Sequence, residues 1–429
     1  MLYSSLKPGA GGSRLYQAPR GTSDILPEEQ KYWSYVKHKA AEICRLYGYE
    51  RINTPIIEDA GLFTRGVGEN TDIVEKEMYT FEDRGGNKLA LIPEGTASIC
   101  RAYVEHGMHN LPQPVRLYYT SPFFRYDRPQ AGRYRQYYQV GFEAMGNNDP
   151  VLDAEIIDMV WQFYHSLGLR KLNLGLNSIG CRECRPEYLS ALKKHYSEYT
   201  GELCSDCKIR LEKNPMRLLD CKRPSCQPVA DSAPKSFDYL CPDCDEHFIL
   251  LQKYISLIGI PFKVNHRMVR GLDYYTRTVY EVEPEKESGQ SSLGGGGRYD
   301  DLIEELGGKP TPGVGFAAGI ERIILNLKRQ NIEVPPLESP RVFIAHMGEE
   351  AGEEAIKLAS GLRQAGIGVL EATGGRSLKA QLRQANTLGV RHTVIIGDEE
   401  VKSGTVILRD MTTARQEAVS SDKLKELLK

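Results

Sequence analysis

The chain has 429 residues, of which 41% are hydrophobic and 26% charged, and its 55 Lys and Arg against 57 Asp and Glu give a formal net charge of -2. These values exclude collagen-like, disordered and disulfide-scaffold proteins, and the length predicts two or three domains. No apolar run approaches the roughly 18 residues of a membrane span, and the N-terminal residues lack the apolar stretch of a signal peptide, so we expect a cytoplasmic protein without a membrane segment.

The first half of the chain predicts a mixed domain behind a flexible, Gly- and Ser-rich tail at residues 1–15. Apolar residues spaced by three and four predict a helix that begins at Pro27 and ends just before Gly48. Runs of β-branched and aromatic residues predict strands at 88–92, 115–126 and 134–146, the last two as a long antiparallel hairpin. A second helix is predicted to carry one apolar face and to stop at Gly168; that face consists of Leu152, Ile156, Val160, Phe163 and Leu167.

Further along, a strand is predicted at 276–283, followed by two glycine-rich segments at 293–300 and 311–327. Glycines there indicate backbone that lies close to a ligand. After the Pro-rich link at 334–340, the pattern changes to a separate α/β domain. Its expected strands are 341–346, 368–372, 392–397 and 405–410, with helices at 349–365 and 377–388.

Eight of the ten cysteines lie between Cys181 and Cys244. Three pairs have the C-x-x-C spacing of chelating thiolates, and a fourth pair is looser. We predict two structural zinc sites, because four-thiolate zinc sites are coordinatively closed. One set is Cys204, Cys207, Cys221 and Cys226, and the other is Cys181, Cys184, Cys241 and Cys244, with His247 as a substitute ligand. The alternative is a set of reduced cysteines without a metal.

Nothing in the sequence matches GxxxxGK[ST], and GVGFAAG has the wrong spacing for GxGxxG, which disfavours P-loop and Rossmann enzymes. Instead, arginines recur beside glycines on the predicted strands and hairpin. The planar guanidinium fork suits phosphate oxygens, although any one exposed arginine is as easily a solvated charge. Together they predict a polyphosphate site formed by Arg125, Arg128, Arg133, Arg135, Arg270, Arg298 and Arg322.

At this point several segments resemble the motifs of the histidyl-tRNA synthetase family, which belongs to the class II aminoacyl-tRNA synthetases. They are FFRYDRPQAGRYRQYYQVGFEAMG, VRGLDYYTRTVYEV, LGGGGRYDDLIEELGG and GVGFAAGIERIIL. GYERINTPIIEDAGLF resembles motif 1 of the class II dimer interface, and PEGTAS resembles the family's amino-acid loop. RGLDYY is the most specific segment, and the resemblance runs from about Tyr16 to the end of the chain.

The resemblance implies an α+β fold, with an antiparallel sheet flanked by helices, and a homodimer. Its catalytic domain comprises residues 16–176 and 262–328, interrupted by a cysteine-rich insertion at 177–261. A linker at 329–340 then leads to an α/β anticodon-binding domain at 341–429, whose candidate basic residues are Arg376, Lys379, Arg383 and Arg391.

The family's site roles transfer residue by residue. Arg125 and Arg270 match the catalytic arginines, and the residues matched to ATP, which binds with Mg²⁺, are Arg125, Arg133 and Arg322. The histidine-binding set is Glu94, Gly95, Thr96, Arg125, Gln139, Glu143, Arg270, Tyr274 and Tyr275. Within that set, Glu143 and Tyr275 match the pair that reads the imidazole nitrogens. Arg128 and Gln130 match residues that meet the tRNA acceptor end, whereas Asp127 departs from the motif's usual Glu and shortens that carboxylate by one methylene.

The implied activity joins L-histidine to the 3′ end of tRNA(His) through a histidyl-adenylate made from ATP. One alternative is a catalytically inactive relative that resembles the regulatory subunit of ATP phosphoribosyltransferase, which typically lacks catalytic arginines and the C-terminal domain. Another is a zinc-dependent nucleic-acid-binding protein, which leaves the arginine and glycine segments unexplained. Histidine-dependent ATP turnover separates the first hypothesis from both others.

Overall fold

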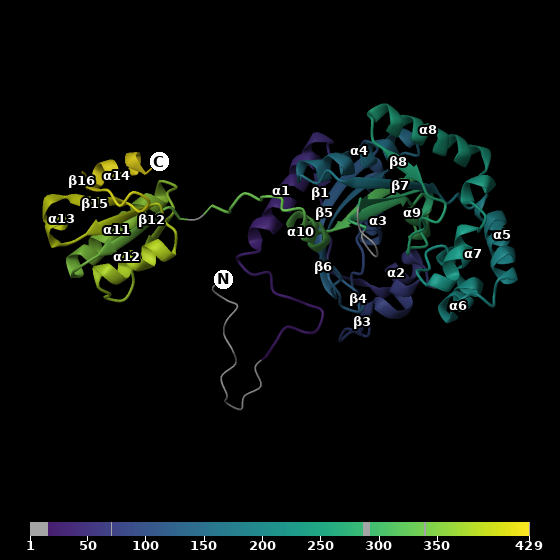
Figure 1. The fold of residues 1–429 in the computed structure, drawn as a ribbon, viewed down its shortest axis with the longest axis horizontal. Coiled ribbons are helices and arrows are strands. Elements are labelled where there is room, and N and C mark those ends of the chain that lie inside the picture. The colour runs from purple at the N-terminus through teal and green to yellow at the C-terminus, as the bar shows by residue number, and fades with distance from the viewer. Residues whose placement is uncertain (1–15, 70, 286–291, 339, 429) are drawn as a thin grey trace. The chain divides into compact units, whose positions relative to one another are not determined.

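The computed structural model describes residues 16–69, 71–285, 292–338 and 340–428, so the predicted tail at 1–15 lies outside the described residues. The chain divides into two compact units, one ending at Pro335 and the other beginning at Pro336. Each unit has its own sheet (Figure 1). Among the described residues, no helix is both long enough and apolar enough to cross a membrane.

A large mixed sheet forms the centre of the first unit (Figure 1). Its strands, in spatial order, are β1 (Glu50–Arg51), β5 (Val115–Phe124), β6 (Gln136–Met145), β11 (Gly313–Gly319), β10 (Gly294–Arg298), β9 (Thr276–Pro284), β7 (Leu172–Ser178) and β8 (Phe262–Val264). From β5 to β7 the neighbours pair antiparallel, whereas the outer strands β1 and β8 pair parallel. The predicted antiparallel sheet is therefore confirmed for its central strands.

The β5–β6 hairpin confirms the predicted pairing, with a register that runs from Val115 opposite Met145 to Phe124 opposite Gln136. Burial alternates residue by residue along β5, as a half-buried strand requires. Both strands stop short of the predicted bounds, because residues 125–135 form an irregular loop. That loop carries four of the seven predicted arginines, namely Arg125, Arg128, Arg133 and Arg135.

Helices cover both faces of this sheet. The helices of the first unit are α1 (Gln30–Leu46), α2 (Ala60–Val67), α3 (Thr96–Glu105), α4 (Pro150–Ser166), α9 (Leu302–Glu305) and α10 (Ile320–Arg329), and those of the insertion are α5 (Arg185–Glu198), α6 (Ser205–Lys213), α7 (Gln227–Asp231) and α8 (Pro242–Ile258). One core lies between the sheet and α1, α4, α8 and α10, while α2, α3 and α9 pack in the other.

The two helices expected in the first half of the chain are both present. In α1, the predicted apolar residues Val36, Ala40 and Ile43 are buried. In α4, the Asp149 carboxylate accepts a hydrogen bond from the Val151 amide at 2.9 Å, and Pro150 occupies the first turn. A short polar cap followed by proline is a common helix start, so this end of α4 is fixed locally.

The predicted insertion at 177–261 packs onto the rest of the first unit and shares its second core. Tyr188 and Leu192 of α5 belong to the same buried cluster as Val269, Tyr274 and the hairpin strand β5. A smaller sheet of β2 (Ile57–Asp59), β4 (Lys88–Leu91) and β3 (Tyr79–Glu82) lies in the same unit. The insertion therefore contributes to the surroundings of the candidate site.

The second unit is the predicted α/β domain. Its sheet, in spatial order, consists of β13 (Val369–Glu371), β12 (Val342–His346), β14 (His392–Ile396), β15 (Thr405–Asp410) and β16 (Gln416–Ser420). The helices are α11 (Glu349–Gln364), α12 (Leu378–Thr387), α13 (Asp398–Ser403) and α14 (Leu424–Leu427). The sequence did not predict β16 or α13, because both are short and polar and carry little hydrophobic periodicity.

Candidate active site and metal centres

A cavity of about 810 Å³ lies in the first unit. Its walls come from the β5–β6 hairpin, strands β9 to β11, the start of α3, the loop before β9 and part of the insertion. The sequence-predicted residues among its lining are Glu94, Gly95, Thr96, Arg125, Arg133, Gln139, Arg270, Tyr274, Tyr275 and Arg322. Residues spread over more than 220 positions of sequence thus meet in one place.

Glu94 is fixed at the beginning of α3. Its carboxylate accepts hydrogen bonds from the amides of Thr96 and Ala97, both at 2.8 Å, and from the Tyr274 hydroxyl at 3.2 Å. Burial raises the pKa of Glu94, while the amide bonds act in the opposite direction. The carboxylate is held rigidly at the cavity wall, as recognition of an ammonium group requires.

Gly95 is required by the close approach of Tyr119. A Cβ at Gly95 would lie 2.5 Å from the Tyr119 ring, and a Cβ at Gly141 would lie 2.2 Å from it. Tyr119 lines the cavity, and its buried hydroxyl has no hydrogen-bond partner among the described residues. The buried side-chain oxygen of Gln139 is likewise unpartnered within the described chain, so both groups are available to a polar ligand.

Glu143 lies directly behind the cavity wall. The residue is fully buried, and its carboxylate accepts hydrogen bonds from the Thr96 hydroxyl at 2.9 Å and from the Tyr299 hydroxyl at 2.7 Å. It is absent from the described cavity lining, although Thr96 and Tyr299 belong to that lining. Burial raises the pKa of Glu143 to about 8.

The raised pKa of Glu143 connects this carboxyl to the stability of the fold. Burial also raises the pKa of Glu321 to about 7, and the ordinary value of both carboxyls is 4.5. Between pH 4.5 and about 8 the folded chain holds protons that the unfolded chain has lost. This contribution to stability is therefore complete below pH 4.5 and is lost as the pH rises through the folded pKa.

Replacing Glu143 with Gln should remove its share of that pH dependence. We expect the free energy of unfolding to fall less steeply from pH 5 to 8 in the variant, by up to about 1.4 kcal/mol per pH unit. The amide fits because the Thr96 and Tyr299 hydroxyls can each donate or accept. Urea unfolding at several pH values measures the slope, and an unchanged slope would contradict the raised pKa.

Four of the seven predicted arginines line the cavity. Arg125 donates to the carbonyl oxygen of Pro93 at 2.8 Å, and its guanidinium lies 5.8 Å from the centre of the Tyr137 ring. Arg322 donates to the carbonyls of Ser292 at 2.9 Å and Gly132 at 3.2 Å. These backbone bonds orient both forks without neutralising their charge.

Among the predicted arginines, Arg270 is the closest in sequence to Tyr274 and Tyr275. It forms an ion pair with Glu281 on β9, and its guanidinium lies 5.7 Å from the centre of the Tyr275 ring. Its buried Nε has no hydrogen-bond partner among the described residues. A permanently charged group with a free donor in a cavity can bind an anion.

The other three arginines do not line the cavity. Arg135 packs on the Tyr126 ring at 3.7 Å, and Arg128 is exposed on the irregular loop, as is the other predicted tRNA contact, Gln130. Including Arg298 in the phosphate site was wrong. Its side chain is fully buried and pairs with Asp153 and, at 2.9 Å, with Asp300, because a buried guanidinium needs anionic partners.

Asp127, which replaces the usual Glu of the motif, reaches a neighbour on its own loop. Its carboxylate pairs with Arg133 at 3.0 Å and accepts the Arg128 amide at 2.6 Å. Both Asp127 and Arg133 line the cavity. The shorter carboxylate therefore orders the loop that carries a candidate phosphate ligand.

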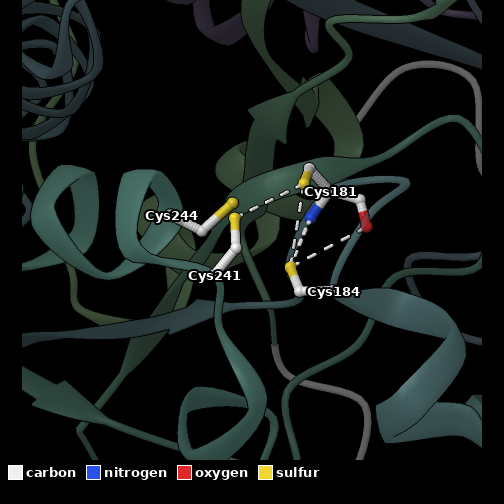
Figure 2. A group of neighbouring side chains, drawn as sticks. All are labelled: Cys181, Cys184, Cys241 and Cys244. Atoms are coloured by element: carbon white, nitrogen blue, oxygen red, sulfur yellow. Dashed lines mark hydrogen bonds between the residues drawn. The ribbon is translucent and has the colours of Figure 1, made fainter.

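The eight clustered cysteines form two groups with the predicted membership. The sulfur atoms within each group all lie within 4.8 Å of one another. In the group of Cys181, Cys184, Cys241 and Cys244, the side chains from one loop and from the start of α8 point toward a common centre (Figure 2). Cys181 Sγ lies 3.7 Å from Cys184 Sγ and 3.8 Å from Cys241 Sγ.

His247 is not part of either group, so naming it as a substitute ligand was wrong. Its buried ring bonds to Asp153 at 3.2 Å and to the Thr278 hydroxyl at 3.4 Å. Asp153 also pairs with Arg298, which ties α4 and α8 to strands β9 and β10. His247 lies three residues after Cys244 on α8, and its bonds to Asp153 of α4 and Thr278 of β9 hold its ring.

Sequence reasoning missed several residues that line the cavity. They include Glu77, Tyr119, Tyr137, Glu281, Tyr299 and Glu321 from the catalytic part, and Arg210 and Arg217 from the insertion. Tyr119 could have been predicted only from the register of the hairpin. That register places Tyr119 opposite Gly141, where the absence of a side chain leaves room for the Tyr119 ring. Arg210 and Arg217 carry no local signal, since they lie in a segment with no nucleotide-binding pattern.

Comparison with known proteins adds independent evidence. The profile described as Histidyl-tRNA synthetase matches residues 21–183 and 245–323, and the one described as Anticodon binding domain matches residues 341–429. A Histidine--tRNA ligase of Dehalococcoides mccartyi is 62% identical over 410 residues, covering 96% of this chain and 98% of the relative. One from Desulforamulus reducens is 51% identical over the same shares of the two chains.

Solved structures agree with the sequence comparison. The crystal structure of apo S. aureus histidyl-tRNA synthetase superposes with a TM-score of 0.82 at 38% identity and covers 96% of this chain and 100% of that chain. An ATP phosphoribosyltransferase regulatory subunit/histidyl-tRNA synthetase of Bacillus halodurans shares the fold alone, with a TM-score of 0.64 at 22% identity over 90% of this chain and 99% of that chain. Relatives of such identity over nearly the whole length place the chain in the histidyl-tRNA synthetase family.

Proposed function

We propose that the cavity is where this histidine–tRNA ligase activates L-histidine with ATP and then charges tRNA(His). In the first step a carboxylate oxygen of histidine attacks the α-phosphorus of ATP, and the bond to pyrophosphate breaks. In the second, a hydroxyl of the terminal ribose attacks the carbonyl carbon, and AMP leaves. The family uses ATP together with Mg²⁺, and Mg²⁺ enters as part of the nucleotide substrate.

The observation that carries the proposal is that Glu94 and the arginine forks meet in one cavity. Arg125, Arg270 and Arg322 supply fixed positive charge where negative charge develops on the phosphates. Glu94 and the free oxygen of Gln139 supply acceptors for the α-amino group. Glu143 and Tyr275, with Tyr274 beside them, then bind the two imidazole nitrogens. An apolar analogue would leave these polar groups unpaired and would therefore bind less well.

The charging step tests this function. Histidine, ATP and a tRNA(His) transcript should yield histidyl-tRNA, whereas a transcript for another amino acid should remain uncharged. The exposed Arg128 and Gln130 are our candidates for contacts with the acceptor end. The regulatory relative is disfavoured, because Arg270 and Arg322 line the cavity and residues 341–429 match the anticodon-binding profile. Charging of both transcripts, or of neither, would contradict the proposal.

We also propose that each cysteine group binds one structural Zn²⁺. Tetrahedral zinc with Zn–S bonds of about 2.3 Å separates its sulfurs by about 3.8 Å. The sulfurs of Cys181 and Cys184 are 3.7 Å apart, and those of Cys204 and Cys221 are 3.9 Å apart, whereas a disulfide requires about 2 Å. The spacing thus fits four thiolates around one ion.

Metal analysis checks this assignment. Protein purified without chelator should contain about two zinc ions per chain, and Cys207→Ala should lose one of them and unfold at a lower temperature. Cys44→Ala offers a matched control, because this buried cysteine lies outside both groups. Metal-free protein with an unchanged melting temperature would exclude structural zinc.

A homodimer is proposed from the motif 1 resemblance. In the same region Ile56, Ile57 and Phe81 are between 41% and 44% exposed, so this part of the chain presents apolar side chains at its surface. An obligate partner surface would cover such side chains. Light scattering after gel filtration should give twice the chain mass of 48.2 kDa, and a monomer would contradict this proposal.

A further inference from the structure

The segment of the insertion between Cys204 and Cys226 reaches the catalytic cavity. Cys204 and Cys221, whose sulfurs are 3.9 Å apart, both line that cavity, and so does Arg217. Helix α6 begins directly after Cys204, and the turn Pro215–Leu218 ends shortly before Cys221. This cysteine group therefore closes a short loop of chain that forms part of the wall.

The same segment contacts the irregular loop that carries Arg270, Tyr274 and Tyr275. The side-chain amide of Asn214 donates to the Asp273 carboxylate at 2.8 Å. The Arg217 guanidinium lies against Gly271, since a Cβ there would be 3.5 Å from its Nη1. Asn214 and Arg217 lie in sequence between the Cys204–Cys207 and Cys221–Cys226 pairs. They thus contact Asp273 and Gly271, the two residues that flank Leu272 in the loop.

Further contacts hold Arg217 in place. Its guanidinium lies 3.8 Å from Asp72 and 3.7 Å from Asp220. Arg210 pairs with the same Asp72 at 3.2 Å, and Lys213 pairs with Glu75 at 2.6 Å. These ion pairs anchor α6 to the catalytic part, and in the described structure Lys213 makes no hydrogen bond or ion pair to the loop at 270–275.

The loop is anchored on both sides: Tyr274 donates to Glu94 at 3.2 Å and Arg270 pairs with Glu281 in the catalytic part, and other contacts come from the insertion. The Asp273 amide donates to the Val67 carbonyl at 3.1 Å, and the loop contains no helix or strand in the described structure. At its far end the Tyr275 carbonyl accepts from Arg185, which directly follows Cys184 of the other cysteine group. The position of Arg270 thus depends on contacts from the insertion as well as on its ion pair with Glu281.

We propose that the Cys204–Cys207–Cys221–Cys226 zinc site is a positioning element of the active site. By closing residues 204–226 it holds Asn214 and Arg217 against the loop, so that Arg270 meets the α-phosphate in a productive orientation. The inference rests on the proposed function. A displacement of about 1 Å at a reacting group can lower the rate by up to about 10²-fold.

Variants within the segment test the positioning role. Arg217→Ala should lower kcat for histidine-dependent ATP–pyrophosphate exchange about tenfold, with a smaller change in the KM for histidine, because the loop becomes less ordered. Arg217→Lys should recover part of kcat by keeping the charge beside Asp72. Lys213→Ala is the matched control, since it removes an ion pair of the same interface, and it should leave kcat unchanged. Equal losses in Arg217→Ala and Lys213→Ala would overturn the proposal.

Metal removal supplies a readout that does not depend on activity. We expect Cys221→Ala to lose one zinc and to increase hydrogen exchange in backbone amides at 268–276, while exchange in α4 stays unchanged. Unaltered exchange at 268–276 in protein that has lost this zinc would refute the coupling. Wild-type protein without histidine-dependent turnover would instead refute the proposed function, so the two failures are distinguishable.

Discussion

Replacing Arg270 with His should lower the rate of histidyl-adenylate formation by about 10²- to 10³-fold, the usual cost of removing one group that stabilises developing charge. At pH 8 the imidazole is mostly neutral, so the cavity loses the charge and the free Nε donor of Arg270. Histidine affinity should change far less, because Glu94 and Gln139 remain in place. Single-turnover kinetics and equilibrium dialysis measure the two quantities separately.

Two further variants make the Arg270 result interpretable. Arg270→Lys keeps the charge without the planar fork and should recover part of the rate. Arg182→His is a matched control, because Arg182 is an exposed arginine that pairs with Asp301 at 2.8 Å outside the cavity. If Arg270→His weakens histidine binding and slows adenylate formation by the same factor, Arg270 stabilises the bound substrate and the transition state equally. That result would contradict a catalytic role for Arg270.

Replacing Glu143 with Gln should lower kcat/KM for histidine by about 10²- to 10³-fold, because an amide cannot ionise and so cannot become the charged acceptor that a bound imidazole N–H prefers. The KM for ATP should change little. The same variant is expected to be more stable than the wild type at pH 8, since the cost of ionising a buried carboxyl disappears. Activity and stability should therefore move in opposite directions.

A loss of activity together with a gain in stability would show that Glu143 recognises the substrate and does not merely pack in the core. Tyr299→Phe removes the hydroxyl that donates to Glu143 at 2.7 Å but leaves the carboxylate, so it should cost less than tenfold in kcat/KM. If Glu143 serves only to hold Thr96 and Tyr299, the Gln variant should retain kcat/KM within a few-fold of wild type. That result would remove Glu143 from the histidine-binding set.

Elements with strong periodicity were predictable from the sequence. The faces of α1 and α4 and the β5–β6 hairpin follow from apolar spacing and β-branched composition, which act locally. Strands β1 and β8 were not predicted. They are only two and three residues long, which is too short for a recognisable pattern, and they form by pairing with β5 and β7. Helix α13 and strand β16 were also not predicted, because they are short and carry little hydrophobic periodicity.

At the site, residue chemistry could be predicted better than residue surroundings. Arg125 and Arg298 look alike in sequence, since both are arginines on strand-like segments beside aromatic or glycine residues. The first lines the cavity, whereas the second is neutralised by Asp153, which lies 145 positions away along the chain. His247 was misassigned similarly, because its partner Asp153 lies on α4. Long-range pairs of this kind have no local signature.

The most direct test of the central claim is ATP–pyrophosphate exchange with each of the twenty amino acids in turn, using protein purified without chelator. The proposed site predicts exchange with histidine alone, because its acceptors match both the α-amino group and the imidazole. Binding of histidine without any exchange would contradict the claim and favour a regulatory relative. Exchange with several amino acids would contradict the proposed reading of the imidazole ring.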